Sequence, residues 1–519
     1  MKKILFFLGL FSWLGANLHA QVITIIDEET GNPIKDVSLI SNNPSIITTT
    51  NSEGQVEISE FNGVEYIQII KIGYKRQVRS YASLDSVDLI VALIPFEFSS
   101  DAVIVSANRW AQNIGDIPER TISISPKEVG LQNPQTAADL LGGSGEVFIQ
   151  KSQFGGGSPM IRGFSTNRLL YSIDGVRMNN AIFRGGNLQN VISLDPFAIE
   201  RTEILFGPGS VMYGSDAIGA VMSFKTLSPE LSLTDKTLVT GSALTRYASA
   251  SNEKTVHFDV NLGWKKWAVL TSFSSNDFGD LKMGSYGPDE YLRPIYVQRQ
   301  NSTDVIISNK DPRIQNPTGY SQMNLMQKIR FKPNTHWNIE YGFHLSETSS
   351  YSRYDRHIRY KNGLPRYGEW SYGPQKWMMN HLSITSTKRN KMYDQMNIRL
   401  AQQSFEESRI SRDFNKFDRE TRIEYVYAYS GNIDFIKSLG ARNTLQYGAE
   451  VVLNDVVSRG INEDISTGVK SEGASRYPQA SWMSSGIYIT NQFKVSEQLI
   501  ISAGMRYTQF QLDAEFDTT

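Results

Sequence analysis

The sequence predicts a mostly β protein with an N-terminal β-sandwich, a small α+β domain and a large antiparallel sheet of the β-barrel type. Apolar and polar residues alternate with a period of two through much of the chain after residue 228. The chain has 40 glycines, which suits many tight turns. Its mean hydropathy is −0.32, and no apolar run beyond residue 20 is long enough for a membrane-spanning helix. A membrane position would therefore require a β-barrel.

The composition argues against several classes of function. The net charge of −1 provides no broad positive field for nucleic acid. Cysteine is absent, so disulfide frameworks, thiolate metal sites and cysteine nucleophiles are excluded. The spacing of the remaining polar residues provides no nucleophile–base pair and no zinc-ligand pattern. We therefore predict no catalytic residue, no metal ligand and no cofactor, and we expect that the chain is not an enzyme.

Residues 1–20 are predicted to be a signal peptide. Met1-Lys2-Lys3 is followed by the apolar run Ile4–Leu14, and Ala20 provides a small residue at the cleavage point. An uncleaved anchor would need about 20 apolar residues.

Residues 21–96 alternate short β-prone segments with turns. The segments DEETGNPIKDVSL at 27–39, TTTNSEGQVEIS at 48–59 and IIKIGYKRQ at 69–77 resemble the carboxypeptidase-regulatory-like β-sandwich. This module implies a spacer or docking domain rather than a peptidase, since no HxxE zinc pair occurs.

Residues 97–112 form a linker, and residues 113–228 form the small α+β domain. Glycines 155–157 predict a bent loop, and Leu169–Ile173 is a short strand that ends at the turn Asp174-Gly175. The next strand, Ile199–Leu205, mixes apolar residues with charges. Since buried charges must be paired or hydrated, we expect this domain to lie inside a polar-lined container such as a barrel.

Four motifs in series carry a resemblance to a known family: IRGF at 161–164, SIDGVRMNN at 172–180, IERTEILFGPGSVMYG at 199–214 and AIGAVMSF at 217–224. Together they resemble the plug domain of TonB-dependent outer-membrane receptors, of the Bacteroidetes type in which a carboxypeptidase-regulatory-like domain precedes the plug. The residues that carry the motif are Arg162, Gly163, Asp174, Gly175, Arg177, Glu200, Arg201, Glu203, Gly207, Tyr213 and Gly214. Their charged members are expected to contact the barrel wall.

The resemblance also implies a TonB box just before the plug. The β-prone run consists of Asp101, Ala102, Val103, Ile104, Val105, Ser106 and Ala107. Such a segment pairs with its energising partner by strand addition, so β-branched residues suit it.

Residues 229–519 are predicted to form the N-terminal half of a transmembrane β-barrel. Short turns alternate with long polar segments, which is typical of outer-membrane barrels. Predicted strands include 392–402, 420–435 and 443–456, with long connections near 403–418 and 458–478 between them. We count about eleven strands, whereas a plugged transporter has about 22. The chain is therefore expected to be a C-terminally truncated fragment.

Basic and aromatic residues gather in the predicted loops and are candidates for ligand binding through charge and ring contacts. The candidates are Gly155, Gly156, Arg184, Tyr354, Arg356, His357, Tyr360, Trp370 and Tyr372. Interface and loop packing explains the loop residues equally well. Haem capture would require a loop or plug histidine as axial ligand, and residues 147–224 contain no histidine.

The resemblance implies energised import of a scarce ligand across the cell outer membrane, with the N-terminal domain and plug toward the periplasm. An iron-siderophore is favoured, and haem, cobalamin and glycan stay open. The implied partners are the TonB–ExbB–ExbD complex, outer-membrane lipid and the small-molecule ligand; a surface lipoprotein is left open, and nucleic acid is not expected. The alternative is a ligand-sensing receptor or binding module that does not itself transport.

Overall fold

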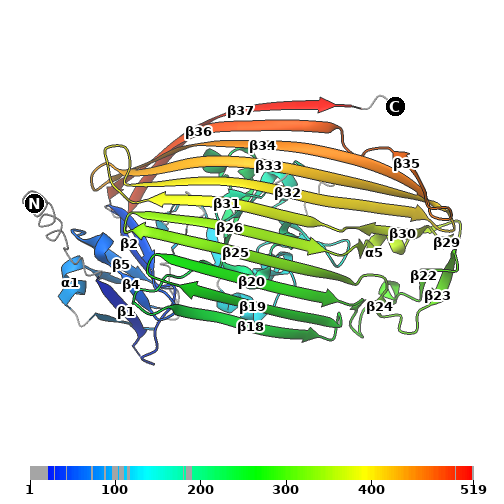
Figure 1. Ribbon diagram of the computed structural model, residues 1–519, viewed down its shortest axis with the longest axis horizontal. Helices are drawn as coiled ribbons and strands as arrows, with labels where there is room; N and C mark the ends of the chain where they lie inside the picture. Colours follow the sequence, from blue (N-terminus) through cyan, green and yellow to red (C-terminus); the bar gives the residue numbers. More distant parts are fainter. Residues whose placement is uncertain are drawn as a thin grey trace, which may run out of the picture. The chain divides into compact units, whose positions relative to one another are not determined.

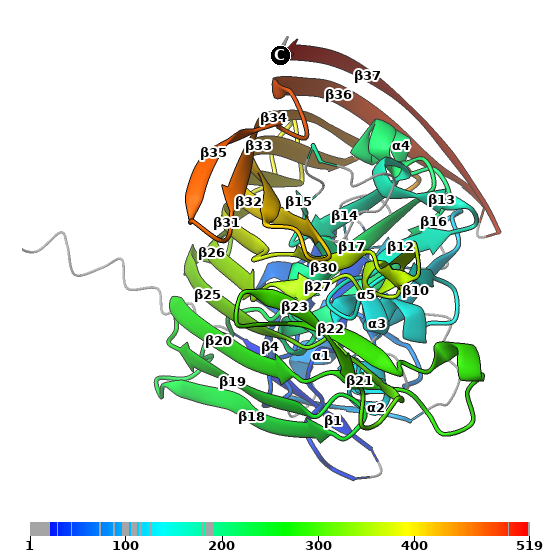
Figure 2. The same ribbon diagram turned by 90° about the vertical axis from the view of Figure 1, so that its right-hand side faces the viewer.

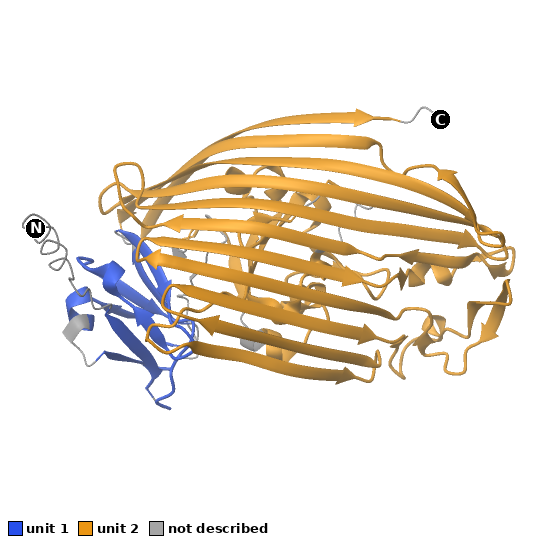
Figure 3. Ribbon diagram, viewed as in Figure 1, with its two compact units in different colours: residues 1–99 blue, residues 100–519 orange. Residues whose placement is uncertain are grey.

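The computed structural model describes residues 21–516 except 29, 43, 72–73, 87–88, 96–102, 105–109, 111, 114–116, 125, 179–180, 183–189 and 497. The predicted signal peptide lies outside the described residues. The chain forms two compact units, residues 1–99 and residues 100–519 (Figure 3). No helix in the described ranges is long and apolar enough to cross a membrane.

The first unit contains two small sheets around one core. One has the order β4-β1-β7, with β1 Val22–Asp27, β4 Gln55–Glu57 and β7 Ile90–Leu93. The other has the order β3-β2-β5-β6, with β2 Ser38–Asn42, β3 Ser45–Thr49, β5 Ile67–Ile70 and β6 Gln77–Arg79. Alternate residues such as Ile23, Ile25 and Leu39 are buried between the sheets, as a period of two requires. The helix α1 (Tyr81–Ser86) and the 3-10 turn η1 (Ser59–Phe61) were not expected from the β-prone pattern.

The small α+β domain is built on a five-stranded sheet of order β10-β16-β17-β14-β15. Its strands are β10 Thr121–Ile124, β14 Leu169–Ile173, β15 Val176–Arg177, β16 Ile199–Phe206 and β17 Ala220–Thr226. A second sheet joins β11 Phe148–Gln150, β12 Ser158–Ile161 and β13 Phe164–Ser165, and β8 Val103–Ile104 pairs with β9 Gln112–Asn113. The helices and 3-10 turns are α2 Pro126–Gln132, α3 Ala137–Gly143, α4 Ser210–Tyr213, η3 Thr166–Arg168, η4 Asn190–Ser193, η5 Pro196–Ala198 and η6 Ser215–Ala217. Thr136 and Asp139 form a capping box that begins α3.

The large antiparallel sheet has eleven strands along its main path in the described part of the chain, as the alternation predicted (Figure 1). They are β18 Leu238–Ala248, β19 Glu253–Gly263, β20 Trp267–Phe278, β25 Tyr320–Asn334, β26 Trp337–Thr348, β31 Lys376–Ser386, β32 Gln395–Asp413, β33 Asp418–Ser438, β34 Asn443–Asp464, β36 Gln479–Ser496 and β37 Leu499–Glu515. The sheet curves round the small domain (Figure 2). The mostly β fold with a plug and a partial barrel is confirmed.

The remaining elements lie in the long connections. They are β21 Leu281–Lys282, β22 Ile295–Gln300, β23 Thr303–Ser308, β24 Ile314–Gln315, β27 Tyr351–Ser352, β28 Tyr360–Lys361, β29 Leu364–Pro365, β30 Tyr367–Tyr372, β35 Val469–Gly473, η7 Asp289–Tyr291 and α5 Tyr354–His357. In Figure 1 most of them lie at the right-hand end of the sheet, opposite the short turns.

The large sheet has an apolar outer face and a mostly polar inner face, with apolar inner residues such as Trp377 and Met379 where it packs on the small domain. On β19 the outward Val256, Phe258 and Val260 are 50%, 41% and 41% exposed. The intervening His257 is only 3% exposed because it faces the small domain. This is the inverse of a soluble sandwich, and it suits a sheet whose outer face contacts hydrocarbon.

Three strands are longer than the alternation predicted. β32 continues to Asp413, β33 begins at Asp418 and β34 continues to Asp464, so much of the predicted long connections at 403–418 and 458–478 is strand. Backbone pairing needs no apolar side chains, and it therefore continues past the apolar band into polar sequence. A hydropathy pattern cannot reveal this part of a strand.

Candidate functional site

The long connections and a loop of the small domain build an aromatic cluster at one end of the sheet. Its members are Phe154, Phe278, Tyr320, Tyr351, Trp370 and Tyr372. The ring centroids of Phe154 and Phe278 are 5.3 Å apart, and those of Phe154 and Tyr320 are 5.7 Å apart, both edge-to-face. Such pairs are favourable for aromatic quadrupoles. The cluster joins the small domain to the sheet because Phe154 comes from one and Phe278 and Tyr320 from the other.

Gly155 allows this approach. A Cβ at this position would lie 3.1 Å from Cγ of Tyr351 and 3.3 Å from Cε1 of Tyr320. A larger residue would have to push the two rings away. The predicted role of Gly155 as part of a bent loop thus has a packing reason.

Three guanidinium groups lie over the ring of Trp370. The Cζ atoms of Arg353, Arg356 and Arg409 are 5.1, 5.6 and 5.1 Å from its centroid. Asp355 pairs with Arg353 at 2.7 Å and approaches Arg356 at 3.8 Å. No carboxylate of the described residues lies within ion-pair distance of Arg409. The cluster, here called the Trp370 arginine cluster, therefore carries excess positive charge.

The predicted ligand residues do not all meet. Trp370 and Tyr372 are buried in the aromatic cluster, and Arg356 lies over Trp370. Tyr354 lies apart from the cluster, under the guanidinium of Arg293 at 5.7 Å. Tyr360 on β28 is 54% exposed. Gly156 is packed by Gln153, and Arg184 lies outside the described residues.

His357 has a structural task. Its Nε2 donates to the carbonyl oxygen of Trp370 at 2.9 Å, and its own carbonyl accepts from Nη2 of Arg293 at 2.9 Å. Burial lowers the pKa of His357 to about 4, although the Trp370 carbonyl acts in the opposite direction. Because its Nε2 is buried and hydrogen-bonded to the Trp370 carbonyl, this nitrogen is not free to serve as an axial haem ligand.

Asp174 joins the small domain to the sheet wall. It lies at the left-handed turn after β14, with φ of 49°, beside Gly175 at 81°. Its Oδ2 lies 2.9 Å from Nζ of Lys328 on β25 and accepts from Oγ1 of Thr226 at 2.6 Å. Nζ of Lys328 also lies 3.4 Å from Oε1 of Glu340. The turn geometry presents the carboxylate to the wall.

Arg177 makes the second such contact. Its Nη1 lies 2.5 Å from Oδ2 of Asp216, and its Nη2 lies 3.2 Å from Oε1 of Glu450 on β34. The same Glu450 oxygen lies 3.3 Å from Nη2 of Arg506 on β37. Gly214 lies beside both guanidinium groups at φ of 85°, a left-handed conformation that favours glycine.

The other motif residues act within the small domain or beside it. Arg162 lies over the ring of Phe206 at 5.2 Å, and Nε of Arg201 lies 2.9 Å from Oε1 of Glu203. Gly163 and Gly207 occupy left-handed turns. Glu200 accepts a hydrogen bond from Ser228, and Tyr213 is buried. Only part of the charged motif therefore contacts the wall.

The Asp101–Ala107 run is described only at Val103–Ile104, which pairs with Gln112–Asn113 as a short antiparallel ladder. The other residues of the run lie outside the described residues. Val103–Ile104 has extended backbone, which is the conformation that strand addition uses.

The sequence does not show which wall residues meet the small domain: Lys328, Glu340, His344, His381, Glu450 and Arg506. It also gives no indication that Arg409 joins the arginine cluster. The sequence feature that could have indicated these contacts is a charged residue on the polar, inward-facing side of an alternating strand. That signal marks many wall residues, and it does not say which of them meets the small domain.

Comparisons with known proteins agree with this geometry. Residues 113–221 match the family model of the TonB-dependent Receptor Plug Domain. The chain is 34% identical over 191 residues to a vitamin B12 transporter BtuB of Vibrio vulnificus strain CMCP6, which covers 36% of this chain and 29% of that protein. It is 29% identical over 132 residues to a BtuB of Photobacterium profundum, covering 25% and 21%. The chain thus spans about a third or less of the length of these curated relatives.

Solved structures show the same fold. The copper transporter OprC has a TM-score of 0.60 at 13% identity, covering 76% of this chain and 55% of that one. FpvA of P. aeruginosa, in complex with a pyoverdine and iron, has a TM-score of 0.55 at 11% identity, covering 92% and 62%.

Proposed function

Because the chain belongs to the TonB-dependent receptors of the outer membrane, we propose that it imports a scarce ligand by energised movement of its plug, residues 113–228. The observation that carries this proposal is how the plug is attached to the wall. Polar contacts such as Asp174–Lys328 and Arg177–Glu450 join the two. These pairs are buried, and an apolar cluster that includes Trp377, Met379 and Phe405 of the wall also contacts the plug. Breaking buried pairs costs free energy, so movement of the plug needs an outside source of energy, which an energising partner would supply.

The Trp370 arginine cluster is the proposed ligand-facing surface. Its excess positive charge lies over aromatic rings, beside the plug loop that contains Phe154 and Gly155. Guanidinium groups on rings favour an anionic or aromatic ligand. An anionic ferric siderophore fits this chemistry better than a neutral glycan, and the buried, hydrogen-bonded His357 argues against haem ligation at this point.

The segment Asp101–Ala107 is the proposed TonB box, and residues 21–96 are proposed to be a carboxypeptidase-regulatory-like spacer on the periplasmic side. A partner that pulls the box would act first on the plug, since the box immediately precedes residue 113. Backbone hydrogen bonds between the box and its partner would transmit the pulling force, and they do not depend on particular side chains.

The test is ligand uptake by a cell that lacks its own receptors and carries the intact gene. Radiolabelled ferric siderophore, haem, cobalamin and an oligosaccharide are offered separately, and binding and uptake are measured in the same cells. Import predicts that one ligand accumulates and that accumulation stops when the proton gradient is collapsed. Binding without gradient-dependent accumulation of any ligand would contradict import and favour the sensing alternative.

A further inference from the structure

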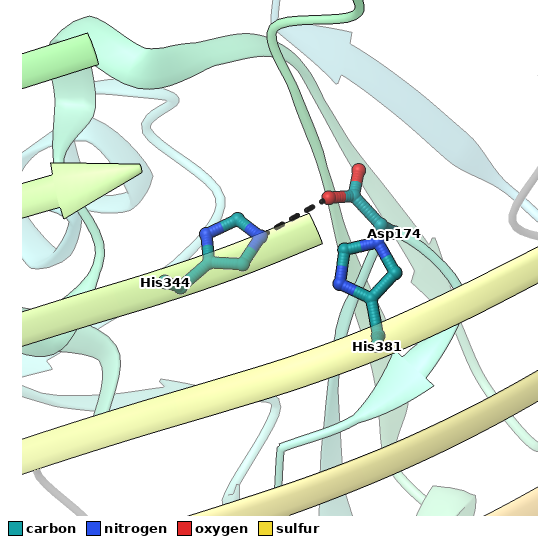
Figure 4. Close-up of side chains that lie close together, drawn as sticks. All are labelled: Asp174, His344 and His381. Atoms are coloured by element: carbon teal, nitrogen blue, oxygen red, sulfur yellow. Dashed lines mark ion pairs between the residues drawn. The ribbon is translucent and has the colours of Figure 1, made fainter. Parts of the chain in front are cut away.

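The contact of Asp174 with the wall includes two histidines. His344 on β26 and His381 on β31 stack at 5.5 Å between centroids, and Nε2 of His344 lies 3.7 Å from Oδ2 of Asp174. Figure 4 shows both rings beside the carboxylate. One ligand atom from each of the three residues lies within 4.8 Å of the other two. The three residues come from the plug and from two neighbouring wall strands.

The imidazole nitrogens are buried without the hydrogen bonds that buried polar groups normally make. Nδ1 and Nε2 of His381 and Nε2 of His344 have no hydrogen-bond partner among the described residues. Leaving such groups unsatisfied costs free energy, and it calls for a specific reason at each site. A bound ion would satisfy one nitrogen of each ring.

Gly342 on the wall leaves room for the His381 ring beside His344. His381 lies opposite Gly342 in the antiparallel ladder, and a Cβ at Gly342 would lie only 2.2 Å from Cε1 of the imidazole. Any other residue at 342 would displace the ring from its place beside His344. A small cavity lined by Thr226, Asn324, His344 and Trp377 adjoins the cluster.

We propose that Asp174, His344 and His381 bind a divalent transition-metal ion that pins the plug to the wall. Two neutral imidazoles and one carboxylate suit zinc, cobalt, nickel or copper rather than magnesium or calcium. In a tetrahedral site the ligand atoms lie about 3.3 Å apart, so separations of up to 4.8 Å would shorten by at most about 1.5 Å when the ion binds. The fourth position is open to water. This ion has a structural role and is distinct from the transported ligand, so the proposal does not depend on what the receptor imports. The ion with its three ligands is called the clasp below.

Lys328 is the natural competitor of the ion. Its Nζ holds the same Oδ2 of Asp174 at 2.9 Å, and Glu340 offers it a second carboxylate at 3.4 Å. When a metal ion takes Asp174, the ammonium group moves to Glu340. The clasp and the ion pair are thus alternative ways to hold the same turn.

Co²⁺ is the probe, because its visible absorption reports the ligand field. The intact protein purified in detergent is freed of metal, titrated with Co²⁺ and then challenged with Zn²⁺. One equivalent should bind with an intense tetrahedral-type spectrum, which Zn²⁺ should abolish. The thermal unfolding temperature should rise with the metal.

Variants separate the clasp from adventitious binding. His344→Ala and His381→Ala should each weaken Co²⁺ binding by about 100-fold or more. Gly342→Ala, which displaces only the ring of a ligand, should weaken it by about 10–100-fold. Lys328→Met should have the opposite effect and strengthen binding, because the competing cation is gone. His336→Ala, in an exposed turn, is the matched control and should bind as the wild type does.

The Lys328→Met variant also protects the test against misfolding, since a merely unfolded variant cannot bind the ion more tightly. Stoichiometric Co²⁺ binding that survives in both His344→Ala and His381→Ala, or no binding by the wild type at millimolar Co²⁺, would overturn the proposal.

Discussion

Oδ2 of Asp174 lies 2.9 Å from Nζ of Lys328, and the Lys328 side chain is completely buried. The carboxylate belongs to the plug and the ammonium to strand β25 of the wall. A buried charge is destabilising without its partner. The wall is therefore stable only when the plug turn places Asp174 beside Lys328. It also means that moving the plug must expose or re-pair Lys328.

Lys328→Met should therefore destabilise the metal-free protein. It leaves Asp174 without its closest cation, and breaking one side of a buried pair costs about 3–5 kcal/mol. The measurement is the midpoint of denaturant unfolding, with Lys391→Met in an exposed turn as control. The double variant Asp174→Asn with Lys328→Met should recover much of the loss, and a double variant no more stable than Lys328→Met would show that the pair is not coupled.

Arg177 and Glu450 should couple the plug to strand β34. Arg177→Ala removes the 3.2 Å contact and Glu450→Gln removes the negative charge from it, so a double-mutant cycle should give a coupling free energy of about 1–3 kcal/mol. Arg177 with Arg162 makes the comparison pair, because Arg162 contacts Phe206 inside the plug. Additive effects of Arg177→Ala and Glu450→Gln would contradict a direct contact.

The Trp370 arginine cluster should govern the binding of an anionic ligand. Arg353→Ala and Arg409→Ala should each weaken ferric siderophore binding by about tenfold, since each removes a cation over the ring. The loss should shrink at high salt, where exposed charges are screened. Arg389→Ala, in an exposed connection at the opposite end of β31, is the control. Equal effects of Arg389→Ala and Arg409→Ala would place the ligand elsewhere.

Replacement of Ile104 by proline should stop uptake while ligand binding persists. Proline removes the backbone donor that a strand-adding partner would use. Ile104→Val retains the donor and the β-branched shape, and should transport normally. Uptake is measured with the ligand identified by the cell assay, and binding is measured on the same cells without an energy source. Normal uptake by Ile104→Pro would remove Asp101–Ala107 from consideration as the box.

The loop around α5 should lose stability in acid. The pKa of His357 is lowered to about 4 by burial, against about 6.5 in an unfolded chain. The folded loop thus binds fewer protons than the unfolded one. Its stabilisation is complete above about pH 6.5 and is lost as the pH falls toward 4, by about 3 kcal/mol in all.

His357→Gln should remove this pH dependence, because glutamine can donate to the Trp370 carbonyl without titrating. The readout is the difference in thermal midpoint between wild type and variant at pH 7.5 and pH 4.5, with the exposed His336→Gln as control. A difference that does not change with pH would show that His357 is not buried in solution.

The class of the fold could be predicted from the amino-acid pattern alone. The period-two alternation predicted eleven wall strands because each wall strand must present opposite chemistry to its two sides. The motif series around Asp174-Gly175 and Ile199–Gly214 identified the plug, because left-handed glycine turns and a charged strand leave a local signature. The linear pattern also indicated that the plug charges need polar partners.

Only the tertiary structure decided which partners these are. Asp174 and Lys328 are far apart in the sequence, as are Arg177 and Glu450, and nothing local distinguishes Lys328 from other inward polar residues. Tertiary contacts also determine three other features. These are the lengths of β32–β34, the burial of His357, and the stacking of His344 with His381 beside Gly342. Pairing register and the curvature of the sheet bring these side chains together, and both depend on contacts made across the whole fold.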